Sequence, residues 1–180
     1  RVIASNLEKC FAGTHLHFKD SENDSLKAAE EEIESFWKSL KLTENGVNIQ
    51  APTFGELEAV YNILNEENIN ISGTQVNTLT LNQKDSKNNK DIDIVEARLE
   101  SVEEMEYRCL LYFGKLSQKE KDEFDEICKL KNIKFISSEV VYTLVEEYKK
   151  FTDNNLEFKQ EQLSLSGEAI FPCKLKILDD

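Results

Sequence analysis

The stretch that decides the fold is SEVVYTLVEEYKKFTDNNLEFKQEQL, residues 138–163, which reads as one long helix. Ser138 is a candidate N-cap, because its hydroxyl can accept a hydrogen bond from an unpaired amide of the first turn. Four apolar residues follow at spacings of three and four, which places them on one helical face: Val141, Leu144, Tyr148 and Phe151. At about 1.5 Å per residue such a helix is some 35–40 Å long. The apolar face fades halfway along, as expected for a helix that leaves its domain. An ordinary terminal helix that frays into a linker has the same pattern.

Length and charge limit the classes of partner. The chain has 180 residues, enough for one full domain with parts of its neighbours. Its formal net charge is −13 at pH 7, from 35 acidic residues against 22 lysines and arginines. Proteins bind phosphate backbones by displacing counterions with Lys and Arg, so a chain this acidic is a poor general binder of nucleic acid. Any such contact would use local basic spots.

Neither a membrane-spanning segment nor a signal peptide is expected, and the reduced cysteines described below favour a cytosolic compartment. No apolar run approaches the roughly 18–20 residues that span a bilayer, so we expect no membrane insertion. The chain begins at Arg1 without a Met and without the apolar segment of a signal peptide. We therefore interpret it as a piece of a longer cytoplasmic protein.

Metal ligation is not indicated. None of the four cysteines forms a C-x-x-C pair: Cys10, Cys109, Cys128 and Cys173. Cys109 and Cys128 lie in apolar patterns and are expected to be reduced core residues. His15 and His17 alternate on an expected strand, and without a third ligand nearby we favour solvent-facing side chains over a metal site.

Strand and helix patterns alternate from Val47 onward. We expect strands at 47–51, 74–80, 107–113 and 133–136, and helices at 26–42, from 53, at 91–102 and at 117–131. Such alternation predicts parallel pairing with right-handed crossovers. The predicted fold class is α/β: a three-layer helix–sheet–helix sandwich with a four-stranded parallel sheet, followed by the long connecting helix.

The helices have predicted caps and buried faces. Thr53 with Glu56, and Ser117 with Glu120, have the spacing of capping boxes. Gly55 is expected to serve close packing rather than phosphate binding. The expected inward residues are Ile33, Phe36, Trp37 and Leu40; Leu57, Val60, Tyr61 and Leu64; Ile92, Val95 and Leu99; and Phe124, Ile127 and Leu130.

No catalytic constellation is evident. Ligands of open α/β sheets bind at the carboxyl ends of the strands, but neither a G-x-G-x-x-G nor a G-x-x-x-x-G-K-[ST] loop is present. Ser137, Ser138 and Glu139 follow the last strand, yet no His lies downstream of His17, and helix capping explains them. The chain is therefore interpreted as an interaction or spacer module.

Three stretches together resemble one family. They are GVNIQAPTFGELEA (46–59), FISSEVVYTL (135–144) and AIFPCKLKIL (169–178). In this order and spacing they look like translation initiation factor five-B of eukaryotes and archaea, the relative of bacterial initiation factor two. The opening NLEKCFAGT (6–14) is similar to the end of that family's second domain.

The resemblance implies a division of the chain and a role for it. Residues 1–20 would end a preceding β-rich domain, 21–138 would form the α/β/α sandwich domain, 139–165 the long connecting helix, and 166–180 the first strand of a following β-barrel domain. The parent would be a ribosome-dependent GTPase that promotes joining of the ribosomal subunits and engages the initiator tRNA through its last domain. GTP and Mg²⁺ would bind only in an upstream domain that this chain lacks. Loop 82–90 looks longer and richer in Asn and Lys than is usual in the family.

Residue roles follow from this picture as hypotheses. Val141, Leu144, Tyr148 and Phe151 would clamp the long helix to the sheet domain, so that a rotation upstream becomes a shift at its far end. Eight lysines are candidate ribosome contacts, although ordinary solvated lysines fit the pattern too: Lys84, Lys87, Lys90, Lys129, Lys131, Lys134, Lys174 and Lys176.

Two other classes remain open from sequence. One is a stand-alone α/β module that binds a small ligand or nucleotide. The other is an enzyme whose site is completed by residues outside this chain.

Overall fold

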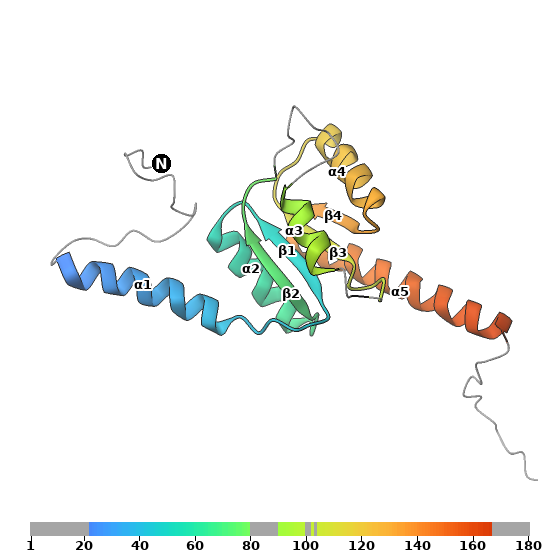
Figure 1. The fold of residues 1–180 in the computed structure, drawn as a ribbon, viewed down its shortest axis with the longest axis horizontal. Helices are drawn as coiled ribbons and strands as arrows, with labels where there is room; N and C mark the ends of the chain where they lie inside the picture. The colour runs from blue at the N-terminus through green and yellow to red at the C-terminus, as the bar shows by residue number, and fades with distance from the viewer. Residues whose placement is uncertain (1–21, 80–89, 100–101, 103, 167–180) are drawn as a thin grey trace, which may run out of the picture.

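The computed structural model describes residues 22–79, 90–99, 102 and 104–166 (Figure 1). Its helices are α1 (Glu22–Ser39), α2 (Phe54–Glu66), α3 (Lys90–Arg98), α4 (Gln118–Leu130) and α5 (Val141–Ser166). Its strands are β1 (Val47–Ala51), β2 (Ile71–Val76), β3 (Cys109–Phe113) and β4 (Lys134–Ser138). Figure 1 shows α1 and α5 extending away from the sheet in opposite directions.

The four strands form one parallel sheet in the order β2-β1-β3-β4. The chain therefore starts in the middle, crosses to one edge, and returns past β1 to build the other half. This confirms the predicted α/β fold class with its four-stranded parallel sheet and long last helix. Among the strands that the structure describes, β2 and β4 lie at the two edges of the sheet.

The sheet separates two hydrophobic cores, and alternate residues of β3 face one or the other. Cys109 and Leu111 of β3 join a cluster with α2, α5 and the end of α1, which we call the α2/α5 core. Leu110 and Tyr112 join a cluster with α3 and α4, the α3/α4 core. Because both faces are covered, β3 is apolar throughout, as its sequence predicted.

Two asparagines end helices and start strands. Asn68 and Asn132 have φ of 56° and 54°, in the left-handed region that Asn tolerates better than most residues. The next amides, of Ile69 and Ile133, donate to carbonyls five residues back, at Leu64 and Cys128. This is the Schellman ending, and it turns the chain sharply from α2 and α4 into the sheet.

Several predicted bounds are wrong. β2 covers residues 71–76 rather than 74–80, because the turn at Asn68 brings Ile71 directly beside Val47. α3 ends at Arg98 rather than at 102. β3 begins at Cys109 rather than 107, since the chain before it is in a turn closed by the Arg108 amide on the Met105 carbonyl.

Leu130 was predicted to be inside, but it is 75% exposed. Each step of three residues rotates a helix position by about −60°, so two steps from Phe124 carry Leu130 away from the core. Cys128 occupies the buried position instead.

Ser138 does not cap α5 from the N-cap position. It closes β4, and Val140, whose carbonyl accepts from the Leu144 amide, is the residue just before the helix. The Ser138 hydroxyl accepts from the Val140 amide at 3.0 Å, so it binds one amide of the turn.

Gly55 was predicted to allow close packing, and this prediction is wrong. A Cβ atom added at Gly55 would have no atom within 4 Å, so a larger residue would fit there.

Some predictions lie outside the described residues. These include the division at residues 1–20, loop residues 82–89, and the strand at 169–177. The residues concerned are His15, His17, Cys10, Cys173, Lys84, Lys87, Lys174 and Lys176.

Candidate functional site

The first half of α5 is seated in the α2/α5 core. Leu144, Val145 and Tyr148 are buried there, and Val141 and Phe151 pack against the cluster partly buried. We call these five residues the α5 seat. Four of them are the residues predicted from spacing, and Val145 was missed because it lies beside the row of three- and four-residue steps.

Two polar contacts join the α5 seat to its neighbours, one to the chain ahead of β3 and one to the end of α2. The Tyr148 hydroxyl donates to the Glu106 carbonyl at 3.3 Å, ahead of β3. Burial raises the pKa of the Tyr148 phenol well above its usual range, so this donor keeps its proton. Lys149 pairs with Glu67 at the end of α2, and both side chains are about half exposed. Exposed pairs of this kind contribute little, so apolar burial holds the helix.

Beyond Phe151 the helix leaves the core. Leu156 and Phe158 are exposed, and Figure 1 shows the last turns of α5 running past the sheet. The segment 152–166 is roughly 22 Å of helix at about 1.5 Å per residue. The Asn155 Nδ2 atom is buried without a hydrogen-bond partner in the described part of the chain, at the border of the seat.

α1 joins the same core by its last turns only. Phe36 is buried and packs edge-on against Phe54 of α2, with ring centroids 4.3 Å apart. Trp37 lies 6.2 Å from the same ring and is 38% exposed, which is less buried than its predicted inward position. The Tyr61 hydroxyl of α2 accepts from the Lys41 amide at 2.7 Å. Both long helices therefore contact α2.

The carboxyl ends of β1 and β3, where the strand order reverses, are the default ligand position for this topology. Two helix N-termini meet the sheet there, and each has its own carboxylate. Glu120 accepts from the Ser117 amide at 2.8 Å in a complete capping box, and these bonds lower the pKa of Glu120. Thr53 caps α2 by accepting from the Glu56 amide, while its hydroxyl donates to the Glu56 carboxylate. These acids disfavour a phosphate at either helix end.

A polar row crosses the sheet near the same end. Gln75, Gln50 and Tyr112 are paired in register on β2, β1 and β3. Gln50 is 1% exposed; its Nε2 donates to the Asn77 carbonyl, while its Oε1 and the Gln75 Nε2 are buried without partners in the described residues. These two atoms are an acceptor and a donor on directly paired residues. No residue pattern predicted this row, because it depends on which strands are neighbours.

The lysines named from sequence have different surroundings. Lys131 is 17% exposed and pairs with Asp93 and Glu96, and the Glu96 bond chiefly raises its pKa. Lys129 pairs with Asp125 at 2.5 Å on the α4 surface. Lys134 is exposed on β4. The side chain of Lys90 lies outside the described part.

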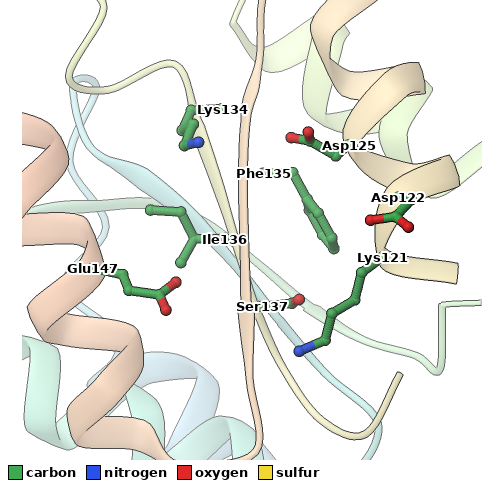
Figure 2. Close-up of a pocket in the computed structure, with 8 residues that line it drawn as sticks. All are labelled: Lys121, Asp122, Asp125, Lys134, Phe135, Ile136, Ser137 and Glu147. Carbon is green, nitrogen blue, oxygen red and sulfur yellow. The ribbon is translucent and has the colours of Figure 1, made fainter. Parts of the chain in front are cut away.

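A groove runs along the outer side of β4, between α4 and α5. It has a volume of about 310 Å³ and is lined by Lys121, Asp122, Asp125, Lys134, Phe135, Ile136, Ser137 and Glu147. Figure 2 shows the strand running through its centre, with the α4 residues on one side and Glu147 on the other. A second hollow of about 280 Å³ continues along α5 to Phe151 and Asn154.

The described residues contain no group of three or more side chains that could hold a metal ion. Cys109 and Cys128 are unpaired and buried, and burial raises the pKa of the Cys128 thiol to about 12. None of the described helices has the length and hydropathy needed to cross a membrane.

The chain is similar along its whole length to known translation initiation factors. Eukaryotic translation initiation factor 5B of Rattus norvegicus is 28% identical over 181 residues, and the probable translation initiation factor IF-2 of Pyrococcus abyssi is 27% identical over the same length. These alignments cover 99% and 100% of this chain. The chain is a relative of these initiation factors. No family model matches it.

The match to 5B-type initiation factors extends to the fold. The crystal structure of GDP-bound aIF5B from Aeropyrum pernix superposes with a TM-score of 0.60 over 82% of this chain, at 19% sequence identity. The chain spans only 14% of the length of the rat protein and 17% of the Pyrococcus abyssi protein. The similarity therefore concerns one part of each of these longer proteins.

Proposed function

We propose that this chain is the relay and ribosome-contacting part of a cytoplasmic GTPase that promotes joining of the ribosomal subunits. The observation that carries the proposal is the alignment of the whole chain with translation initiation factors of eukaryotes and archaea. In this proposal GTP and Mg²⁺ bind in an upstream domain, and the initiator tRNA contacts a later one. This chain supplies no catalytic residue.

The attachment of the two long helices supports a relay. α1 brings the chain to α2 through Phe36 and Tyr61, and α5 leaves from the same core through the α5 seat. A displacement at the end of α1 would therefore press on α2, against which α5 is packed and to which Lys149 is paired. In this role Val141, Leu144, Tyr148 and Phe151 clamp the outgoing helix.

The geometry of α5 sets the size of the output. Its 26 residues give a length of roughly 39 Å at about 1.5 Å per residue. A tilt of about 10° at the seated end would move the far end by about 7 Å, from the same helix length. This requires that segment 152–166 stays rigid.

The exposed lysines are the proposed ribosome contacts. Among the residues described, Lys134 suits this role best because it is exposed. Lys129 suits it next, provided that a ribosomal phosphate replaces Asp125 as its partner. Lys131 suits it least, because two acids of α3 already bind its amine.

The test is a hinge placed in α5 of the full-length parent factor. Asp153 and Asn154 are exposed and lie beyond the seat. Replacing both by Gly weakens the helix by about 1 kcal/mol per residue relative to Ala, whereas replacing both by Ala keeps it stiff. We expect the Gly pair to slow GTP-dependent subunit joining, followed by light scattering, with GTP binding unchanged and the Ala pair active. Equal joining rates for the two pairs would refute the relay.

A further inference from the structure

We propose that the open edge of β4 is a docking site for an extended, basic segment of another protein, which adds to the sheet as a fifth strand. This inference does not depend on the relay. It rests on the backbone of β4, on the groove around it and on the charges that line the groove.

The hydrogen-bonding direction of β4 leaves alternate residues open. The Lys134 amide donates to the Arg108 carbonyl, and the Ser138 carbonyl accepts from the Gly114 amide. In a parallel ladder the N–H and C=O of one residue point to the same side, and the side alternates along the strand. Residues 134, 136 and 138 therefore face β3, and the N–H and C=O groups of Phe135 and Ser137 point outward. An edge with unpaired groups is a template for another strand.

The groove gives that edge the shape of a strand site. Phe135, Ile136 and Ser137 form its floor, and α4 and α5 rise on its two sides (Figure 2). Phe135 and Ile136 are buried beneath it in the two separate cores, so the floor is anchored on both faces. An added strand would place its alternate side chains against α4 and against α5.

The other edge of the sheet is different. The loop after α1 reaches the start of β2, where the Thr43 amide donates to the Ile71 carbonyl at 2.8 Å. Arg98 of α3 crosses over Gly73 to reach Asn48 at 3.4 Å. A segment of this chain thus already binds the outward side of β2 at Ile71, and Arg98 covers the face of that strand, whereas among the described residues the β4 edge opens into the groove.

Charge selects a basic occupant. Three acids line the groove, Asp122 and Asp125 from α4 and Glu147 from α5, against two lysines, Lys121 of α4 and Lys134 of β4 (Figure 2). α4 and α5 each contain five acidic residues and three lysines. Lys119, Lys129 and Lys149 are paired with Glu123, Asp125 and Glu67. Because Asp125 is already paired with Lys129, the acids left to attract a lysine or arginine of an added strand are Asp122 on one side of the groove and Glu147 on the other, within a chain at −13 overall.

The direct experiment titrates the ¹⁵N-labelled chain with a short peptide of alternating threonine and lysine, chosen because Thr favours strands. We expect the amides of Phe135 and Ser137 to shift and to become protected from hydrogen exchange, and those of Lys134 and Ile136 to keep the protection they already have. The matched peptide of threonine and glutamate should produce neither effect. Unchanged exchange at Phe135 and Ser137 would overturn the proposal.

Two charge-reversed variants separate the groove from the overall charge. Asp122→Lys with Glu147→Lys reverses the groove, and Glu126→Lys with Asp153→Lys makes the same change on exposed positions of the same helices outside it. We expect the first pair to weaken peptide binding about tenfold or more relative to the second. Equal weakening would mean general attraction to an acidic protein, and would contradict the proposal.

A backbone variant tests strand addition itself. Ser137→Pro removes an outward donor and leaves the ladder to β3 intact, as Pro does on edge strands. It should abolish peptide binding while the remaining amide spectrum is preserved; retained binding would contradict the proposal. If this variant does not fold, the charge-reversed pairs decide.

Two other occupants are outcomes of the same measurements. Binding of a single-stranded RNA to the Phe135 and Ser137 amides in preference to the peptide would replace the proposal with a nucleic-acid site. Protection of these amides that rises with protein concentration, without peptide, would show that a second copy of the chain covers the edge.

Discussion

α1 and α5 are both long helices that meet the α2/α5 core, yet they are held in different ways. α5 buries Leu144, Val145 and Tyr148 along its first three turns, whereas α1 contributes mainly Phe36 at its last turn. The difference lies in where the apolar residues occur along each helix. A row distributed over several turns fixes a helix axis, while a single aromatic anchor fixes one point. α5 is therefore suited to pass on a change in the direction of its axis, and α1 a displacement of its last turn.

The largest effect should come from shortening a buried residue of the α5 seat. Leu144 has no exposed surface in the α2/α5 core. Leu144→Ala should lower the free energy of unfolding by about 2–5 kcal/mol, as for other buried leucines. Urea denaturation followed by circular dichroism measures this. Val140→Ala is the matched control, because Val140 is exposed one turn earlier, and it should change stability by under about 0.5 kcal/mol. Similar losses for the two variants would remove the distinction between seat and surface.

A smaller effect is expected at the anchor of α1. Phe36 lies at the end of its helix, where neighbouring residues can close the gap, so Phe36→Ala should cost about 1–3 kcal/mol. Trp37, the one tryptophan of the chain, contacts Phe36 with ring centroids 5.5 Å apart and reports on this site directly. Its emission should shift to the red in the variant at denaturant concentrations well below global unfolding. A Trp37 signal that changes only with the main transition would mean that α1 is as firmly integrated as α5.

The smallest effect should follow from breaking the ion pair between α5 and α2. Lys149 and Glu67 are both about half exposed, so solvent and salt screen their attraction. Lys149→Met keeps the apolar stem and should change stability by about 1 kcal/mol or less. A double-mutant cycle with Glu67→Gln measures the coupling. A coupling as large as the loss in Leu144→Ala would show that charge, rather than apolar burial, holds the seat.

Residue patterns predicted the parallel sheet and four of the five residues of the α5 seat. The period-two and three-to-four patterns located β1, α4 and these four residues, because burial on one face repeats with the geometry of the element. A continuous apolar run located β3, because that strand is buried on both faces. Thr53 and Ser117 located two helix starts, since capping is a local interaction.

Features set by distant residues could not be predicted in the same way. The left-handed turn at Asn68 moved β2 toward the N-terminus, and the exact rotation of α4 exposed Leu130. The guanidinium of Arg108 donates to carbonyls of Leu99, Val102, Lys131 and Asn132, linking the ends of α3 and α4. The groove depends on α4 and α5 flanking the same edge strand, which only the strand order reveals.

Hydrogen exchange along α5 tests most directly whether the helix is clamped by its first half. Tyr148→Ala removes a buried ring and its bond to Glu106, and Tyr142→Ala removes the same side chain from a position that is 66% exposed on the same helix. We predict that Tyr148→Ala speeds exchange across residues 144–156 while β3 keeps its protection, and that Tyr142→Ala leaves the exchange of this segment unchanged. Exchange across 144–156 that is the same in wild type and Tyr148→Ala would contradict the clamp, and with it the rigid transmission of motion through α5.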